Sequence, residues 1–452
     1  MPTSIRLRTL LTASLVTMLA VLVPSSISAH AHLERSEPAA DARLSVSPTA
    51  IRLWFSEAPE LALSTVALLD SVGSPVTLGP VERGADGPRS VRVSVRGALA
   101  AGLYRVRWRV AAADGHPSSG AFVFRVLSAA APPAAESSVP SIGRPPVSAA
   151  TVHAAAEADA LAPAYVVVRA LLFIAMLAVI GAIAFRFAVL SPGNALEPLV
   201  RAGLSSSIAA RAAFASVLLI VLLLAKLVLQ ARLVASYSAA LTGMERVAID
   251  SRWGAAWDTQ LAGAVLALAG FVVARRMRAG WSIAAAGAAA IAIGASFSGH
   301  AAASEHLPVL GLITDALHVV GAAGWLGTLL WLVASLPAVS TRDRGVATMV
   351  NAFSPVALAF AALVTITGVV SAWLRLGALP FLWSSSYGQV LLVKLALLSG
   401  VALVGLYNWR RMRPALHTDT VEPRFFRSAT TELALGAAVI IVTAVLVATP
   451  TP

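Results

Sequence analysis

Eight apolar runs, each long enough to cross a lipid bilayer, constrain this chain more than any other feature of its sequence. A helix needs about 20 predominantly apolar residues to span the hydrocarbon core. The runs cover residues 163–190, 209–231, 254–274, 281–299, 309–337, 352–374, 387–408 and 429–448. Of the 452 residues, 58% are hydrophobic and 12% are charged, whereas soluble proteins carry about 25% charged residues. The sequence therefore predicts an all-α polytopic membrane bundle of about eight transmembrane helices within residues 161–452.

The basic residues give this bundle an orientation. The net charge is +12, but the arginines form short clusters between apolar runs, with no basic stripe interleaved with aromatic residues. Nucleic acid is therefore not an expected partner. If the first helix runs inward, most of these arginines, among them Arg275, Arg276, Arg410 and Arg411, lie in inner loops, as the positive-inside rule requires. We expect a multi-pass protein of a bacterial inner (plasma) membrane, surrounded by lipid, with its N-terminal domain on the periplasmic or extracytoplasmic side.

Residues 1–29 have the three parts of a secretory signal peptide. Arg6 and Arg8 form a basic start, LLTASLVTMLAVLV supplies an apolar core, and residues 27–29 read ISA at the expected cleavage position. The core has about 14 residues and is shorter than the span of a bilayer, which favours cleavage over an uncleaved anchor. Cleavage after Ala29 makes His30 the first residue, with a free α-amine beside its imidazole.

Residues 30–128 alternate between hydrophobic and polar side chains with a period of two. The alternation runs through AIRLWFSEAPE, STVALLD, SVRVSV, LYRVRWRV and GAFVFRVL, and it places Ile51, Leu53 and Phe55 on one face. Several short strands separated by Gly, Pro, Asp and Ser predict an all-β sandwich. The chain has no cysteine, so neither disulfides nor thiolate metal ligands occur. Residues 129–160 are rich in Ala, Pro and Ser and predict a flexible linker.

Two segments of this β domain carry candidate metal ligands. HAHLERSEPA begins at His30, and AADGHPSSGAF places Asp114 and His116 in a turn between two strands. An amine, imidazoles and a carboxylate together suit Cu(II), although an Asp-Gly pair is also a common hairpin turn. His32 is a further possible ligand, because a histidine at the third position of a mature chain can chelate Cu(II) with the amine and the intervening amides. That chelate competes with the sandwich site for the amine of His30.

The segments HAHLERSEPAADA, LWFSEAPE, GLYRVRWRV and ADGHPSSGAFVFRV, in this order, resemble the periplasmic copper-binding CopC family. The resemblance implies a cupredoxin-like β-sandwich that binds Cu(II) through His30, Asp114 and His116. The methionine-rich loop that binds cuprous copper in this family has no match in the sequence. The resemblance therefore implies a domain that binds Cu(II) alone.

A second group of candidate ligands lies where the fourth and fifth apolar runs meet at the expected outer face. The group consists of His300, Glu305, His306, Asp315 and His318. Asp315 and His318 are three residues apart and share a helix face, and ionisable residues inside a membrane span are usually functional. The alternative is structural: Asp315 pairs with Lys394, and His318 donates to a backbone carbonyl. For Glu432, near the expected cytoplasmic end of the last apolar run, we expect pairing with Arg427 or a neighbouring arginine.

The segments SGHAAA, DALHVVGAAGWLG, SYGQVLLVKLALL, NWRR and ATTELALGAAV resemble the CopD copper-resistance membrane family. A CopC-like domain joined to a CopD-like bundle implies copper capture outside the inner membrane and transfer across it, with import favoured, and copper ions and other copper-handling proteins as partners. One alternative is a resistance or export partner that sequesters copper. Another, of a different class, is a membrane haem protein. No phosphate-binding loop or hydrolase motif occurs, so an enzyme is not expected.

Overall fold

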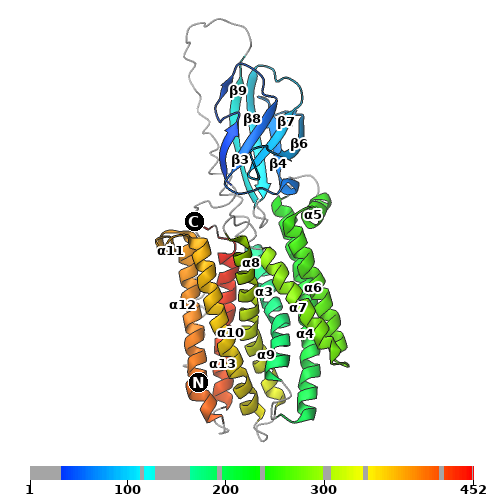
Figure 1. Ribbon diagram of the computed structural model, residues 1–452, viewed down its shortest axis with the longest axis vertical. Helices are drawn as coiled ribbons and strands as arrows, with labels where there is room; N and C mark the ends of the chain where they lie inside the picture. The colour runs from blue at the N-terminus through cyan, green and yellow to red at the C-terminus, as the bar shows by residue number, and fades with distance from the viewer. Residues whose placement is uncertain are drawn as a thin grey trace.

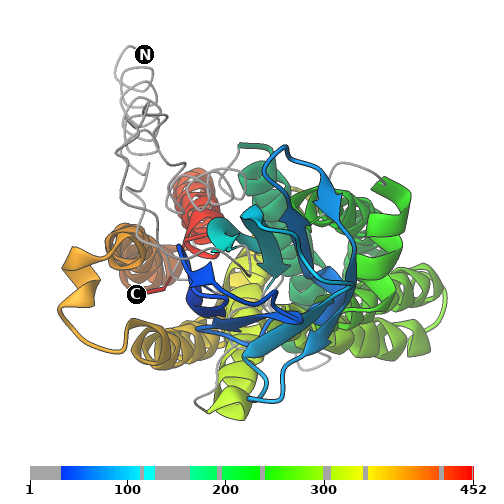
Figure 2. The same cartoon turned by 90° about the horizontal axis from the view of Figure 1, so that it is seen from above.

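The computed structural model describes residues 32–111, 117–127, 163–190, 196–234, 240–298, 307–339, 345–416, 422–449 and 451–452. The predicted signal peptide (1–29) and linker (129–160) lie outside these residues. The described part forms two layers along the long axis of the molecule, a β-sandwich above a bundle of long helices (Figure 1). Seen from above, the sandwich covers part of the bundle's end (Figure 2).

The sandwich consists of two sheets. Its strands are β1 (Leu33–Glu37), β2 (Arg43–Leu44), β3 (Ala50–Phe55), β4 (Thr65–Leu69), β5 (Pro75–Val76), β6 (Leu78–Arg83), β7 (Ser90–Val95), β8 (Gly102–Ala111) and β9 (Pro117–Val126). One sheet has the order β1-β3-β7-β6 and the other β2-β9-β8-β4-β5. All pairs are antiparallel except β2 with β9, which is parallel. The predicted all-β sandwich is therefore confirmed.

The alternation seen in the sequence fills the core of the sandwich. Ile51, Leu53 and Phe55 of β3 are fully buried, and the residues between them point outward because successive side chains of a strand face opposite sides. The Phe55 ring meets Trp108 of β8 edge-on, with ring centroids 5.2 Å apart. Aromatic pairs prefer this arrangement, and here the pair joins the two sheets.

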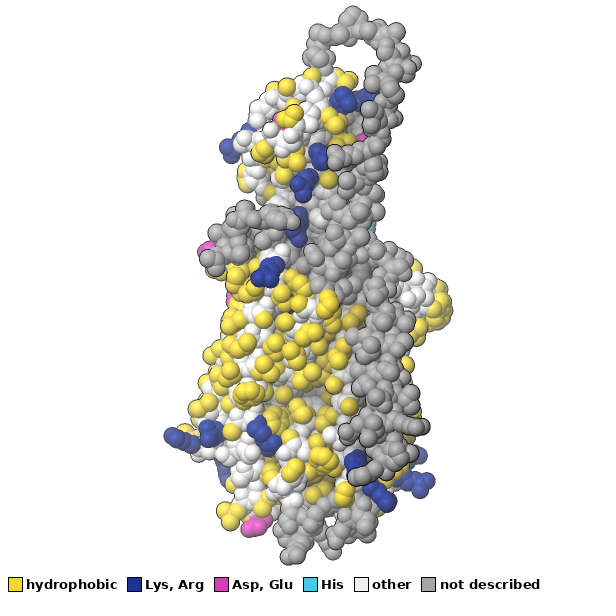
Figure 3. Space-filling model, turned by 180° about the vertical axis from the view of Figure 1, so that it is seen from behind, with side chains coloured by type: hydrophobic (Ala, Val, Ile, Leu, Met, Phe, Trp, Pro, Cys, Tyr) yellow, Lys and Arg dark blue, Asp and Glu magenta, His cyan; other side chains and the backbone are white. Residues whose placement is uncertain are grey.

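Eight helical segments within the described residues are long and apolar enough to cross a membrane, and each overlaps one predicted run. The helices of these segments are α3 (Pro163–Ala184), α4 (Pro198–Val234), α6 (Arg252–Ala274), α7 (Ala279–Phe297), α8 (Pro308–Ala322), α9 (Thr328–Ser335), α10 (Gly345–Leu376), α12 (Ser386–Tyr407) and α13 (Glu422–Leu446), and α8 and α9 belong to one span. Two short helices, α5 (Ala240–Ile249) and α11 (Phe381–Ser384), lie in connections. Figure 3 shows hydrophobic side chains over the outside of the bundle, with Lys and Arg gathered towards its end away from the sandwich.

Three of the spans contain a π-helical turn, in which the helix widens by one residue. These turns are η2 (Phe185–Val189) after α3, η4 (Ala323–Gly327) between α8 and α9, and η6 (Asn408–Met412) after α12. The backbones of α3 and η4 touch, since a Cβ on Gly181 would lie 2.6 Å from the Cα of Gly327. Such turns are rare and often mark functional positions in a helix, so their contacts matter for the sites described next.

Candidate metal-binding sites

The predicted site residues divide into two groups. Those that lie outside the described residues are His30, Asp114, His116, His300, Glu305 and His306. His32, Asp315 and His318 lie within them. In the described ranges, no group of three or more His, Asp or Glu side chains stands close enough to hold a metal ion. The sites are therefore built here from the described residues that flank or contain them.

His32 lies at the start of β1, and hydrogen bonds attach it to the end of β3. Its backbone N–H donates to Ser56 Oγ at 3.0 Å, and its carbonyl accepts from the Ser56 N–H at 3.0 Å. The next residue, Leu33, pairs with Phe55 in the sheet. The start of β1, from His32 on, is thus fixed beside residues 55 and 56.

The turn that carries Asp114 and His116 leaves and re-joins the sheet at this same end of the sandwich. Ala111 closes β8 and Pro117 opens β9, and these two residues pair directly in the sheet. The Glu60 N–H donates to the Ala111 carbonyl at 2.8 Å. Because Glu60 is only four residues beyond Ser56, both segments that carry the predicted copper ligands start from one end of the domain.

That end of the sandwich faces the membrane domain. Leu63, in the 3₁₀ turn η1 (Leu61–Leu63), is 3% exposed and Ala111 is fully buried, and both belong to the apolar cluster that includes Val247 of α5 and Trp253 of α6. η1 contacts α5, and β8 contacts α4; Figure 1 shows α5 between the sandwich and the bundle. The sandwich therefore rests on the bundle through a defined contact.

One ion pair crosses this contact. Arg252 Nε, at the start of α6, lies 3.6 Å from Glu60 Oε1. The Arg252 side chain is 81% exposed, whereas that of Glu60 is 14% exposed. A pair in such contact with water is worth at most about 1 kcal/mol, so apolar burial at Leu63 and Ala111 holds the two parts together more than this charge pair does.

In the membrane domain, Asp315 and His318 both face α10. Arg375 Nη2 donates to Asp315 Oδ2 at 2.6 Å, and Ser371 Oγ donates to Asp315 Oδ1 at 3.2 Å. The expectation that Asp315 pairs with Lys394 is wrong. Asp315 pairs with Arg375, which lies at the outer end of α10. An arginine matches a carboxylate with a directional hydrogen bond as well as a charge, and this acid is already neutralised.

His318 lies one turn deeper than Asp315 and contacts the next polar side chain of α10. Its Nδ1 is 2.9 Å from Thr367 Oγ1. The Thr367 hydroxyl also lies 2.7 Å from the Leu363 carbonyl, and when it donates its hydrogen there it accepts from Nδ1–H. In that tautomer the lone pair is on Nε2, the nitrogen that a neutral imidazole offers a metal when the other nitrogen is held by a hydrogen bond. The ring also hydrogen-bonds with the backbone of Val364, in line with the structural alternative of a bond to a backbone carbonyl.

Glu432 of α13 has different partners from those that the sequence suggested. The expected pairing with Arg427 is wrong: the contact is with Asn408, whose Nδ2 donates to Glu432 Oε2 at 3.0 Å. Asn408 and the nearby Trp325 were not among the predicted site residues. The NWRR motif contained the signal for the first, since an amide at the end of an apolar run is costly to bury without a partner.

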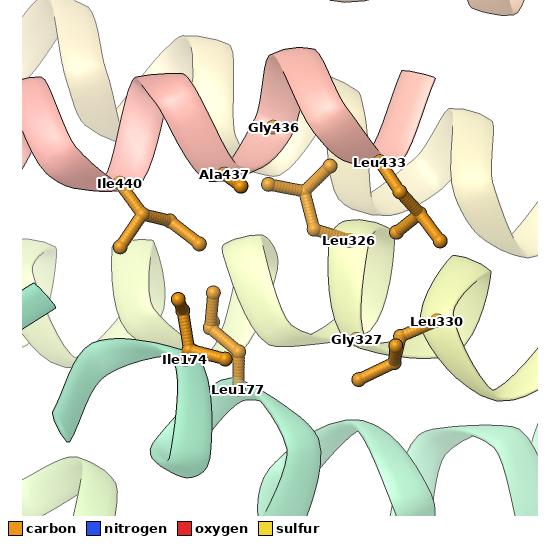
Figure 4. A pocket seen from close by; sticks show the side chains of 9 residues that line it. All are labelled: Ile174, Leu177, Leu326, Gly327, Leu330, Leu433, Gly436, Ala437 and Ile440. Carbon is orange, nitrogen blue, oxygen red and sulfur yellow. The ribbon is translucent and has the colours of Figure 1, made fainter. Parts of the chain in front are cut away.

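An open cavity of about 130 Å³ lies between α3, η4, α9 and α13 (Figure 4). Its walls are formed by Ile174, Leu177, Leu326, Gly327, Leu330, Leu433, Gly436, Ala437 and Ile440. None of these side chains carries a nitrogen, oxygen or sulfur atom. The cavity thus provides no side-chain ligand for a cation and is not the candidate site.

Comparison with protein families assigns nearly the whole described chain. The CopC domain model matches residues 33–127, the model of the copper resistance protein D-like N-terminal domain matches 158–312, and the copper resistance protein D model matches 347–446. The copper transport protein CutJ of Bacillus subtilis (strain 168) is 28% identical over 444 residues, which are 96% of this chain and 76% of that one. The similarity thus extends across both parts of the molecule.

Other relatives match the sandwich alone. Copper resistance protein C of Escherichia coli is 34% identical over 111 residues, covering 23% of this chain and 86% of that protein. Among solved structures, CopC from Methylosinus trichosporium OB3b is 33% identical and covers 22% of this chain and 95% of that one, with a TM-score of 0.21. The methionine-rich copper resistance protein PcoC from Escherichia coli is 37% identical over 22% of this chain and 99% of that one, with a TM-score of 0.20.

Proposed function

The chain belongs to the CopC/CopD copper-resistance family, and from this membership we propose that it captures copper outside the membrane and passes it across. The relatives are named for copper transport and copper resistance, and none of the quoted names describes a catalysed reaction. These names lend no support to the membrane haem alternative. The metal is the cargo of the protein.

The orientation of the sandwich is the single observation that best supports this function. Its end that receives the His30 segment and the 112–116 turn rests on the membrane domain through Leu63 and Ala111. A copper ion held at that end lies between the two parts, and transfer needs no long diffusion. With the predicted linker, the docked sandwich keeps the local concentration of its cargo high at the outer face of the bundle.

For the sandwich we propose a Cu(II) site formed by the amine and imidazole of His30 with Asp114 and His116. His32 is the less favoured ligand. The competing chelate requires the backbone amide of His32 as a metal ligand, and this amide is engaged as a donor to Ser56 Oγ at 3.0 Å. Breaking that bond would also detach the start of β1 from β3.

For the membrane domain we propose that His318 accepts copper through Nε2, helped by Asp315 and by His300, with Glu305 and His306 as weaker contributors at the outer face. The Arg375 guanidinium occupies Asp315, so the acid becomes available to a cation only when this pair opens. His318 is therefore the first membrane ligand in the proposal, and Asp315 follows it.

We propose import as the direction. Arginines gather at the end of the bundle away from the sandwich (Figure 3), which supports that end as cytoplasmic and the sandwich as extracytoplasmic, exported by the predicted signal peptide. An inward-negative potential then favours cation uptake by about 2.3 kcal/mol per charge per 100 mV. Sequestration outside, as part of resistance or export, is the second candidate and uses the same ligands.

Cellular copper content tests this function. Cells lacking the protein would be complemented with the intact chain, His30→Ala, His318→Ala, or His153→Ala in the predicted linker as the matched control. Import requires higher internal copper with the intact chain and the control, and loss of the gain with the two site variants. Lower internal copper with the intact chain would instead establish resistance.

A second experiment tests the N-terminal ligand. One residue inserted before His30 should weaken Cu(II) binding sharply, and unchanged binding would contradict His30 as a ligand.

A further inference from the structure

A buried acid that copper binding does not use lies in the inner half of the bundle. Glu432 is 4% exposed and stands nine residues after Pro423, where the last span begins. At 1.5 Å per residue, this places it about 14 Å from the inner end of that span. A carboxyl group at such a position is costly and is normally retained for a function.

Among the described residues, two neutral side chains are hydrogen-bond partners of Glu432. Asn408 Nδ2 donates to Oε2 at 3.0 Å, and the Trp325 side chain also hydrogen-bonds with this carboxyl. Each partner belongs to a π-helical turn, Trp325 to η4 and Asn408 to η6. Two widened turns from different spans thus converge on a single acid, and this convergence is a second, independent sign of a functional site.

The charged side chains of the neighbouring elements do not pair with this acid. On η6, Arg410 and Arg411 are exposed, as is Arg427 on α13 itself. Lys394 lies 14 residues before Asn408 on the span of α12, about 20 Å away along the helix axis. On α3, Arg169 lies at the outer end and donates to the Ala444 carbonyl. η4 and α9 carry no charged residue.

The packing around Glu432 leaves little space for a hydrated ion. A Cβ on Gly405 would lie 3.1 Å from Glu432 Oε1, so α12 approaches the carboxyl group closely at this glycine. Around Trp325 lie Val401, Val439 and other apolar side chains. An ionised carboxylate without a counter-charge is strongly disfavoured in such surroundings, whereas the neutral acid is compatible with them.

The donor set also favours a proton over copper. Glu432 and Asn408 offer oxygen atoms alone, and an indole N–H cannot ligate a metal, whereas copper sites of this kind use imidazole. Asn408 Oδ1 is buried and has no hydrogen-bond partner within the described residues. If the amide turns over, a proton on Glu432 gives this oxygen its missing donor, and the two amide orientations are not distinguishable by shape.

We propose that Glu432 is a proton-binding site of the membrane domain and that copper passage releases its proton. Trp325 lies seven residues after His318 on one continuous span, about 10 Å deeper. A cation that leaves His318 inward therefore approaches the neutral acid. The O–H bond of Glu432 breaks, the proton leaves to the outer aqueous phase, and the passing cation balances the carboxylate. Once the cation has left inward, a proton from the inner aqueous phase binds the carboxylate and restores the neutral acid, so that one proton moves outward for each cation that enters. This inference rests on the proposed function.

Infrared spectroscopy of the full chain in lipid nanodiscs tests the proton site without any copper. At neutral pH we expect the carbonyl band of a neutral carboxylic acid, which Glu432→Gln removes and Glu432→Asp retains at a shifted position. Glu197→Gln, an exposed acid before α4, is the matched control and should leave the band in place. A wild-type spectrum without this band, or a band that survives in Glu432→Gln, would overturn the proposal.

Liposomes with the full chain and an internal pH dye test the coupling. Under an imposed inside-negative potential, copper uptake by wild type should produce a pH change. Glu432→Gln should still take up copper, but its pH change per copper should be at least ten-fold smaller. Glu432→Asp should restore it. An unchanged pH signal in Glu432→Gln refutes the coupling. Absence of copper uptake by wild type counts against the proposed function, and the infrared band then still decides whether the proton site exists.

Discussion

Asp315 and Glu432 are two acids inside one bundle, 17% and 4% exposed respectively, and they are accommodated in opposite ways. Asp315, near the outer end, receives a guanidinium at 2.6 Å and a hydroxyl at 3.2 Å. Glu432, deeper and nearer the inner end, receives an amide at 3.0 Å. The two acids therefore differ in the partners that the bundle provides: a cation lies beside Asp315, whereas a neutral amide lies beside Glu432.

The two environments also differ in how they are built. Arg375, Ser371 and Thr367 recur every four residues on α10, so one regular helix face supplies every partner of Asp315 and His318. The partners of Glu432 come from two separate π-helical turns. A regular face is a stable support for a charge pair, whereas an irregular one positions a single side chain that no α-helical repeat would present.

The largest effect is expected when the charge pair at the outer end is broken. Arg375→Met leaves the Asp315 carboxyl, which is 17% exposed, without its guanidinium partner, and this should cost about 3–5 kcal/mol of unfolding free energy. The double variant Asp315→Asn/Arg375→Met should recover most of this loss, because both charges are then gone. Chemical unfolding in lipid nanodiscs measures each value. Arg410→Met, at an exposed arginine, is the control, and an equal loss there would remove the basis of the comparison.

A smaller loss is expected at the inner acid. Asn408→Ala removes the amide that donates to Glu432 and should cost about 1–3 kcal/mol. The same unfolding measurement applies. Asn351→Ala is the matched control, because Asn351 is exposed and accepts from Arg413 at 2.6 Å. If Asn408→Ala destabilised the protein as strongly as Arg375→Met, Glu432 would be ionised and the contrast between the two acids would be wrong.

Thr367→Val should cost about 0.5–1.5 kcal/mol, the net value of one hydrogen bond. The change keeps the side-chain shape and removes the acceptor of His318 Nδ1–H, so the proton is free to move to Nε2. We therefore also expect weaker Cu(II) retention by the membrane domain. Thr365→Val is the control, since the exposed Thr365 bonds only to its own helix at Ala361. Equal Cu(II) retention in both variants would contradict the assigned tautomer.

The smallest effect concerns an acid–arginine pair in water. Glu60→Gln removes the pairing with Arg252 across the contact between sandwich and bundle. We expect a loss of no more than about 1 kcal/mol, decreasing further at high salt because exposed charges are screened. Unfolding at low and high salt measures it. A salt-independent loss as large as that of Arg375→Met would show that exposure to water does not decide the strength of these two acid–arginine pairs.

The sequence predicted the two-part architecture because hydrophobic periodicity differs so strongly between strands and spans. It did not predict α5, since ALTGMERVAI is short and its apolar side finds a partner only when η1 lies against it. The π-helical turns also escaped prediction, because they depend on contacts such as that between Gly181 and Gly327. The local sequence does not indicate which distant segment of the backbone will pack against it.

The site residues show the same limit. That Asp315 needed a cation inside the membrane followed from its chemistry, but the sequence-based prediction named Lys394 alone and not Arg375. The choice of Arg375 over Lys394 depends on the rotation of α10 and α12 about their axes, which hydropathy does not give. Glu432, on α13, bonds to Asn408 and not to an arginine. Asn408 begins the π-helical turn η6 after α12, and this turn faces Glu432.

The extra residue in the π-helical turn η4 sets the rotation of α8 relative to α9 within one span. Each residue of an α-helix turns the chain by about 100°, so deleting one residue within Ala323–Gly327 would rotate one half against the other by that angle. Asp315 and His318 could then keep their places against α10 only if Trp325 swung away from Glu432. The number of residues in η4 therefore sets the rotation that lets the outer half of the span face α10 and the inner half face Glu432. An insertion or deletion here would disturb this alignment without changing any polar side chain.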